Sequence, residues 1–134
     1  MREHIIAQVA LNLKILFVED EPGLQRVGKR LLERLSHTVT GFEKPNEALK
    51  YFKQGSNFDV IITDISMPEM SGLQLAREIS FINSSIPIIL ASGRDLDSLR
   101  ELVIPNPLVA LQKPYTRKQL QGALNQAMSL VRDV

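Results

Sequence analysis

Cysteine is absent from this chain of 134 residues, so disulfide frameworks, thiolate metal sites and thiol catalysis are excluded. An excess of one charge is also lacking, because 16 Lys and Arg face 15 Asp and Glu. A chain built to coat nucleic acid or an anionic membrane would carry a larger imbalance. The apolar runs are far shorter than the ~18 residues of a membrane-spanning helix, and polar residues interrupt the first 13 positions, where a secretory signal would stand. We therefore expect a cytoplasmic protein with no membrane insertion and no direct nucleic-acid partner.

The composition that is present is typical of an ordinary globular domain. Hydrophobic residues make up 44% of the chain and charged residues 23%, which excludes disordered, collagenous and coiled-coil classes. A length of 134 residues is close to the usual size of a single domain. We expect one domain over residues 14–134, preceded by an N-terminal extension over residues 1–13.

Short apolar, partly β-branched runs recur along the chain with helix-like segments between them. Most are almost unbroken in apolar character, as is typical of strands that helices cover on both faces. The second run alternates polar and apolar residues, which favours a place at the sheet edge. The alternation of strand and helix predicts an α/β fold with a doubly wound, five-stranded parallel sheet. The runs span residues 14–18, 38–42, 58–63, 87–91 and 108–112.

Apolar residues at helical spacing fill the segments between these runs and follow the last one. Thr116 and Gln119 form a capping-box pattern ahead of the final segment, which favours a helix start there. Asp95 is a candidate N-cap for a short fourth helix. The apolar stripe of the first segment is Leu24, Val27, Leu31, Leu32 and Leu35, and that of the fourth is Leu96, Leu99, Leu102 and Val103.

Charged and polar residues stand where four of the five apolar runs end. In an open parallel sheet, ligands bind beyond the carboxyl ends of the strands, so these residues would face one crevice. Charge after a single strand is unremarkable, but charge or a hydroxyl after four strands of one sheet indicates a site. The residues are Glu19, Asp20 and Glu21 after the first run, Asp64 after the third, Ser92 after the fourth and Lys113 after the fifth.

The charges of this cluster predict a divalent cation. Two carboxylates about 4 Å apart repel each other by about 4 kcal/mol at an effective dielectric constant near 20, and Lys113 supplies only one positive charge. Oxygen ligands without Cys or a nearby His favour Mg²⁺ over zinc. A carboxylate beside such an ion can attack phosphorus and form an aspartyl phosphate. We therefore hypothesise a magnesium-dependent phosphoacceptor centred on one Asp, with Ser92 and Lys113 contacting the phosphoryl oxygens.

The same residues resemble a known family, the CheY-like receiver domain of response regulators in two-component signalling. The likeness covers about residues 14–132 with order and spacing intact, and the stretch around Asp64 is its most specific part. The motifs are Ile-Leu-Phe-Val-Glu-Asp-Glu-Pro at residues 15–22, Asp-Val-Ile-Ile-Thr-Asp-Ile-Ser-Met-Pro-Glu-Met-Ser-Gly at 59–72, Pro-Ile-Ile-Leu-Ala-Ser-Gly at 87–93, and Lys-Pro at 113–114.

The resemblance implies a flavodoxin-like (βα)5 fold with strand order 2-1-3-4-5. It implies that Asp64 takes a phosphoryl group from the phosphohistidine of a histidine kinase or histidine phosphotransfer protein, and that the protein signals by contact with a downstream protein target. It further implies a cis peptide bond between Lys113 and Pro114. The implied magnesium ligands are Asp20 and Asp64 directly, Glu19 through water, and Ser66 through its backbone carbonyl. Ser92 and Lys113 would contact the phosphoryl group and move when it arrives.

Two departures from the family pattern concern the output of the domain. Receivers commonly carry Tyr or Phe three residues before the lysine, and here that position is Ala110. An aromatic side chain therefore cannot relay phosphorylation to the surface formed by the fourth helix, fifth strand and fifth helix in the usual way. The segment Ile-Pro-Asn-Pro at residues 104–107 follows a short fourth helix, and we expect this region to carry partner specificity.

Two other classes of protein share this topology. A magnesium phosphohydrolase with an Asp nucleophile generally needs a second acid two residues later, and Ser66 stands at that position, which disfavours turnover. A flavin or nucleotide binder should have a loop rich in Gly, Ser or Thr after its first strand, where this chain has Glu19, Asp20 and Glu21. We expect a signalling domain that is not an enzyme beyond slow self-phosphorylation and dephosphorylation. A stand-alone regulator and a receiver module of a hybrid histidine kinase both remain open.

Overall fold

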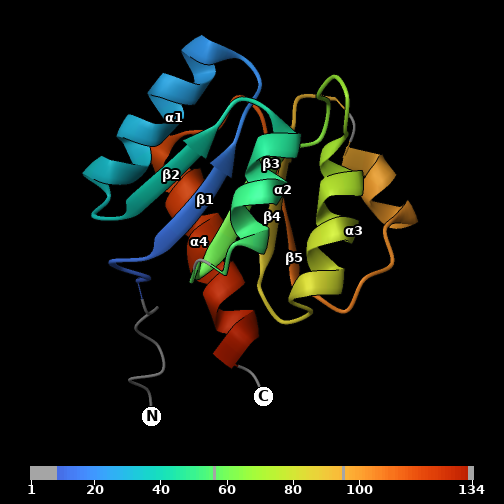
Figure 1. The fold of residues 1–134 in the computed structure, drawn as a ribbon. Coiled ribbons are helices and arrows are strands. Elements are labelled where there is room, and N and C mark those ends of the chain that lie inside the picture. Colours follow the sequence, from blue (N-terminus) through green and yellow to red (C-terminus); the bar gives the residue numbers. More distant parts are fainter. Residues whose placement is uncertain (1–8, 56, 95, 133–134) are drawn as a thin grey trace.

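The computed structural model describes residues 9–55, 57–94 and 96–132. Strands and helices alternate along the whole of this part of the chain (Figure 1). Most of the predicted N-terminal extension, residues 1–8, and the candidate cap Asp95 lie outside the described residues. The strands are β1 (Lys14–Val18), β2 (Thr38–Phe42), β3 (Val60–Asp64), β4 (Ile88–Ser92) and β5 (Leu108–Gln112). The helices are α1 (Pro22–Arg34), α2 (Pro45–Lys53), α3 (Gly72–Ile82), the 3₁₀ helix η2 (Leu96–Glu101) and α4 (Arg117–Arg132).

All five strands form one parallel sheet in the order β2-β1-β3-β4-β5. This confirms the predicted fold class, the implied strand order and the edge position of the second strand. Figure 1 shows the sheet between two layers of helices. The side chains of α1 and α4 form one apolar core with one face of the sheet, and those of α2 and α3 form a second core with the other. Covering both faces explains why the inner strands are apolar throughout.

Two strands end one residue later than the apolar runs predict, and both changes concern the candidate site. Asp64 is the last residue of β3 and pairs with Ala91 of β4, so it lies within the sheet. Ser92 is the last residue of β4, and its carbonyl accepts a hydrogen bond of 2.9 Å from the Lys113 amide. The hydrogen-bond ladder thus continues through the polar residues that follow each apolar run. As a result, the sheet itself fixes the backbone of Asp64 and Ser92.

The first helix turns a different face to the core than its apolar stripe predicts. Its buried residues are Gln25, Gly28 and Leu32, whereas Leu24 and Val27 are 44% and 63% exposed. The helix approaches the sheet at Gly28, where an added Cβ atom would lie 2.4 Å from the ring of Phe17. Since the ring occupies that space, the closest contact falls on the glycine, and the neighbouring apolar residues are rotated toward solvent.

The segment predicted as a short α-helix is instead the 3₁₀ helix η2. Leu96, Leu99 and Leu102 pack against the second core at a spacing of three residues, which matches the three residues per turn of a 3₁₀ helix. Val103, which the predicted stripe included, is 87% exposed. The predicted capping box of the last helix is present, because the backbone amides of Thr116 and Gln119 each donate to the other's side chain at 2.9 and 3.0 Å.

The residues just before the sheet also belong to the first core. Ala10 and Leu13 are buried in it. The Ala10 amide donates to Asn125 at 2.8 Å, and the Ala10 carbonyl accepts from Gln121 at 2.9 Å, both on α4. Across residues 9–55, 57–94 and 96–132, no helix combines the length and apolar character that crossing a bilayer requires.

Candidate functional site

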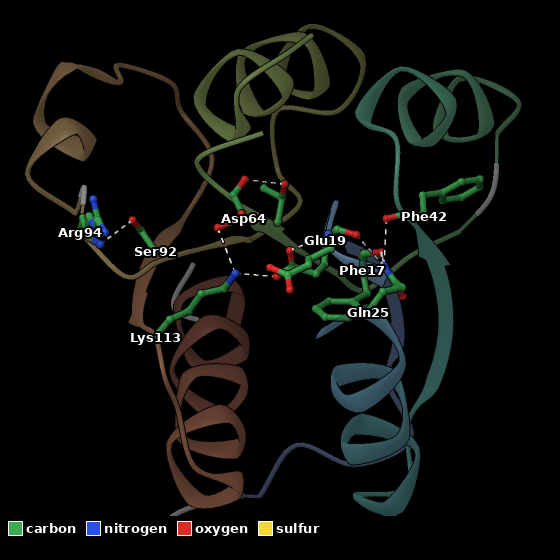
Figure 2. Close-up of polar contacts among 10 residues, drawn as sticks. Phe17, Glu19, Gln25, Phe42, Asp64, Ser92, Arg94 and Lys113 are labelled. Carbon is green, nitrogen blue, oxygen red and sulfur yellow. Dashed lines mark hydrogen bonds and ion pairs between the residues drawn. The ribbon is translucent and has the colours of Figure 1, made fainter. Parts of the chain in front are cut away.

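The predicted site residues converge at the carboxyl ends of the strands (Figure 2). Glu19 and Asp20 follow β1, Asp64 ends β3, Ser92 ends β4 and Lys113 follows β5. Because β1, β3, β4 and β5 are neighbours in a parallel sheet, their ends meet along one edge. The structure therefore brings together side chains that are separated by up to 94 positions in the chain.

Three carboxylates form a compact acidic cluster. Glu19, Asp20 and Asp64 each offer a carboxylate oxygen, and these oxygens lie within 4.8 Å of one another. Glu19 is only 3% exposed and Asp64 9%, while Asp20 is half-buried. Solvent thus screens the mutual repulsion of these groups poorly.

Lys113 lies against two of the three carboxylates. Its Nζ atom is 2.5 Å from Oε1 of Glu19 and 3.3 Å from Oδ1 of Asp64. Burial lowers the pKa of the Lys113 ammonium, but hydrogen bonds and charge attraction from Glu19 and Asp64 outweigh it and raise the pKa above the ordinary value. Lys113 is therefore a permanent cation that the two carboxylates share.

The two buried carboxyl groups remain costly to ionise despite this partner. Burial raises the pKa of Glu19, and Lys113 offsets only part of the shift. Burial likewise raises the pKa of Asp64, with a further contribution from the charge of Asp20. Three carboxylates and one ammonium leave an excess of negative charge among oxygen-only donors. This donor set fits a hard divalent cation such as Mg²⁺, so the residues present match the predicted metal.

A pocket of about 220 Å³ opens beside Asp64. Ser66, an exposed residue, and Ser92, a buried one, both line this pocket. The Ser92 hydroxyl accepts a hydrogen bond of 3.1 Å from the Arg94 amide (Figure 2). The predicted role of the Ser66 carbonyl as a metal ligand stays a prediction. The complete lining is Asp64, Ser66, Ser92, Gly93, Arg94 and Lys113.

The backbone around Asp64 depends on a glycine from the next helix. The Gly72 amide donates to the Ile65 carbonyl at 2.8 Å. A Cβ atom at Gly72 would lie 2.1 Å from the Asp64 carbonyl oxygen. The close approach of α3 to the end of β3 therefore requires glycine, which explains the Gly at the end of the motif around Asp64.

The Lys113–Pro114 peptide bond is cis, as the family resemblance implies.

A second, larger hollow runs from the site along α1. It has a volume of about 440 Å³, and its walls are mainly apolar. Glu19 and Lys113 stand at its polar end, so it is continuous with the acidic cluster. The exposed apolar residues of α1, Leu24 and Val27, therefore border the site. The other lining residues are Leu24, Val27, Gly28, Leu31, Gly93, Pro114 and Tyr115.

Gln25 is a residue near the site that sequence reasoning missed. It is buried, and its side-chain amide donates to the backbone carbonyls of Glu19 and of Phe42, the last residue of β2. A polar residue between the apolar positions of an amphipathic helix is normally predicted to lie on the surface. The sequence feature that could have indicated burial is its helical spacing from Gly28 and Leu32, the other buried residues of α1.

Comparison with known proteins gives one consistent family. The model of the response regulator receiver domain matches residues 15–125. Sensor kinase CckA of Brucella abortus is 32% identical over 116 residues, which make up 85% of this chain and 12% of CckA. The chain thus spans only a small part of that relative.

Solved structures agree with the sequence matches. A response regulator receiver domain protein from Clostridium thermocellum has a TM-score of 0.80 and 32% identity, with 90% of this chain and 97% of that chain covered. The receiver domain of sensor histidine kinase PA1611 from Pseudomonas aeruginosa PAO1 has a TM-score of 0.76 and 27% identity, with 88% and 98% covered. That structure has a magnesium ion coordinated in its active-site cleft.

Proposed function

The chain belongs to the response regulator receiver domain family of two-component signalling, and from this premise we propose that Asp64 is its phosphoacceptor. The donor is the phosphohistidine of a histidine kinase or a histidine phosphotransfer protein, and the phosphorylated domain then signals by contact with a downstream protein. The observation that carries the proposal is the meeting of Glu19, Asp20, Asp64 and Lys113 beside one small pocket.

The transfer makes and breaks one bond to phosphorus. A carboxylate oxygen of Asp64 forms the new O–P bond as the N–P bond of the phosphohistidine breaks. The imidazole nitrogen keeps the bonding electron pair. The other ring nitrogen carries a proton throughout, so the imidazole that departs is neutral. The pocket of about 220 Å³ beside Asp64 has room for the three remaining phosphoryl oxygens.

Magnesium would be held by Asp20 and Asp64, by Glu19 through water, and by the backbone carbonyl of Ser66. When bound, the ion supplies positive charge toward the phosphoryl oxygens as they develop negative charge. The acidic cluster supports this assignment, because its oxygen donors carry more negative charge than Lys113 balances.

Lys113 and Ser92 complete the pocket. The Lys113 ammonium, 3.3 Å from Asp64 Oδ1, lies where it can balance charge on an oxygen of the incoming group. The Ser92 hydroxyl lines the same pocket and can donate to a second oxygen.

The apolar hollow along α1 supports a protein as the phosphodonor. A donor histidine must reach Asp64, so the protein that carries it must cover the adjoining surface. That surface includes exposed Leu24 and Val27, which border the hollow. An apolar helix face of the donor fits this groove. Val27→Asp should then slow transfer from the protein donor and leave phosphorylation by acetyl phosphate unchanged; equal loss with both donors would argue against the groove.

The acceptor assignment is tested by intact mass after incubation with acetyl phosphate, with and without Mg²⁺. We expect a single phosphoryl adduct that requires Mg²⁺ and is cleaved by hydroxylamine. Asp64→Asn should abolish the adduct, and Asp59→Asn, which changes an exposed carboxylate just before β3, should leave it intact. An adduct of equal yield in Asp64→Asn would reject Asp64 as the acceptor.

A further inference from the structure

The buried amide of Gln25 joins the ends of two strands, on the side of Glu19 that faces Phe42 (Figure 2). Gln25 lies on the first turns of α1 and is 8% exposed. Its Nε2 atom is 2.9 Å from the carbonyl oxygen of Phe42, 3.4 Å from that of Glu19 and 3.5 Å from that of Phe17. Two N–H groups thus serve three acceptors, with the shortest contact to Phe42.

These acceptors stand where the segment bearing Glu19 and Asp20 leaves the sheet. Phe42 is the last residue of β2, and Glu19 is the first residue after β1. The Glu19 amide also donates to the Phe42 carbonyl at 3.0 Å. The Glu19 N–H is thus bonded directly to the end of β2, and the Gln25 amide links the Glu19 carbonyl to the same Phe42 carbonyl.

The other end of the same amide is left without a partner. Oε1 of Gln25 is buried and accepts no hydrogen bond from any described residue. It faces Gly41, where an added Cβ atom would lie 2.2 Å away. A methionine of similar length would fill this space without an unpaired oxygen, which is costly to bury. Packing alone does not account for a glutamine here, but the need for its N–H groups does.

We propose that Gln25 is a positioning residue for the metal site, an inference that rests on the proposed function. By holding the Glu19 backbone, Gln25 sets the direction from which the carboxylates of Glu19 and Asp20 reach Asp64. The Glu19 side chain is then held by Lys113 on one oxygen and by the Glu21 amide, at 3.2 Å, on the other. Groups that orient metal ligands in this way typically change metal affinity by about 10–100-fold when removed.

The test compares two glutamines that differ in their place in the fold. Gln25→Met removes the N–H donors at nearly constant volume. Gln121→Met is the matched control, because the Gln121 amide bonds to Ala10 and His37 at the opposite, amino-terminal end of the strands. We expect Gln25→Met to weaken Mg²⁺ binding by about tenfold, measured by calorimetric or NMR titration, and Gln121→Met to leave it unchanged. Equal Mg²⁺ affinity in wild type and Gln25→Met would overturn the inference.

Amide hydrogen exchange without metal separates this inference from the proposed function. We expect faster exchange at the Glu19 amide in Gln25→Met and not in Gln121→Met; unchanged exchange at Glu19 would also overturn the positioning role. A wild-type protein that does not bind Mg²⁺ would reject the proposed function by a separate measurement. If Gln25→Met does not fold, Gly41→Ala displaces the same amide from its other side, and wild-type affinity in that variant would overturn the inference.

Discussion

Replacing the proposed phosphoacceptor with its amide isostere should stabilise the metal-free protein. Asp64 is 9% exposed, and burial and the charge of Asp20 raise its pKa despite the nearby ammonium of Lys113. The ionised group therefore favours the unfolded chain, where water solvates it. Asp64→Asn removes the charge at constant shape, and its amide oxygen can still accept a hydrogen bond from Lys113.

The distances set the size of the effect. Each carboxylate pair within 4.8 Å repels by about 1 kcal/mol at the dielectric constant of water and by about 3.5 kcal/mol at an effective value of 20. Lys113, at 3.3 Å, attracts Asp64 by about 1.3 to 5 kcal/mol over the same range. Two repulsions thus slightly exceed one attraction, and desolvation adds to the difference. We expect a gain of about 1–2 kcal/mol, or about 3–6 °C in Tm.

The pH dependence gives the prediction its sign. Below the pKa of Asp64 in the unfolded chain, the group is protonated in both states and the substitution changes little. As pH rises through the higher pKa of the folded state, wild type loses stability that Asp64→Asn keeps. Thermal and urea unfolding in EDTA should show the full gain at pH 7.5 and a smaller one toward pH 4. A variant less stable than wild type at pH 7.5, or a gain independent of pH, would refute the reasoning.

Three further predictions concern other parts of the site. Mg²⁺ should raise the Tm of wild type by linkage, and Asp20→Ala should abolish that rise; an undiminished shift would place the ion elsewhere. Gly72→Ala should cost about 1–3 kcal/mol in urea unfolding because of its contact with the Asp64 carbonyl. Gly122→Ala, with no atom within 4 Å of the added Cβ, should instead gain about 0.5–1 kcal/mol, and equal effects would contradict the packing argument. Burial raises the pKa of Tyr115, so Tyr115→Phe should remove a phenolate absorbance transition above pH ~10. Because the phenol ionises more readily in the unfolded chain, its contribution to the free energy of unfolding should fall as pH rises past that value.

The sheet could be predicted because its inner strands are buried on both faces. Residues such as Ile15, Ile61 and Ile88 are fully buried, and that environment demands continuous apolar runs. The strand order came from the family resemblance. The register at strand ends could not be predicted, because Asp64 and Ser92 are polar and their place in the ladder depends on neighbouring strands.

In two helices, contacts with other elements override what the local sequence pattern predicts. The apolar spacing of Leu24 and Val27 predicts a buried face, but the ring of Phe17 forces the contact onto Gly28. For η2, a three-residue leucine spacing is compatible with either helix type over so short a length. Both outcomes depend on side chains brought in from other elements.

The charged residues of the candidate site could be predicted from the sequence, but the buried glutamine that bonds to the backbone beside them could not. Glu19, Asp64 and Lys113 follow apolar strands, where packing gives no reason for charge, so the pattern itself marks them. Gln25 carries no such mark, because its role arises from three carbonyl groups that only the folded chain assembles.

Asp64 lies within the hydrogen-bond ladder of the sheet, and this position determines which segments around it are free to move. β3 is hydrogen-bonded to β1 through Thr63 and to β4 through Asp64, so its backbone is held in place by neighbouring strands. Just past Ser92, by contrast, come Gly93 and then η2, which has no buried residue. Segments with few buried contacts have low local stability and move most readily. If Asp64 is phosphorylated as proposed, we therefore expect rearrangement in the chain that links β4 to β5, while the central strands keep their positions.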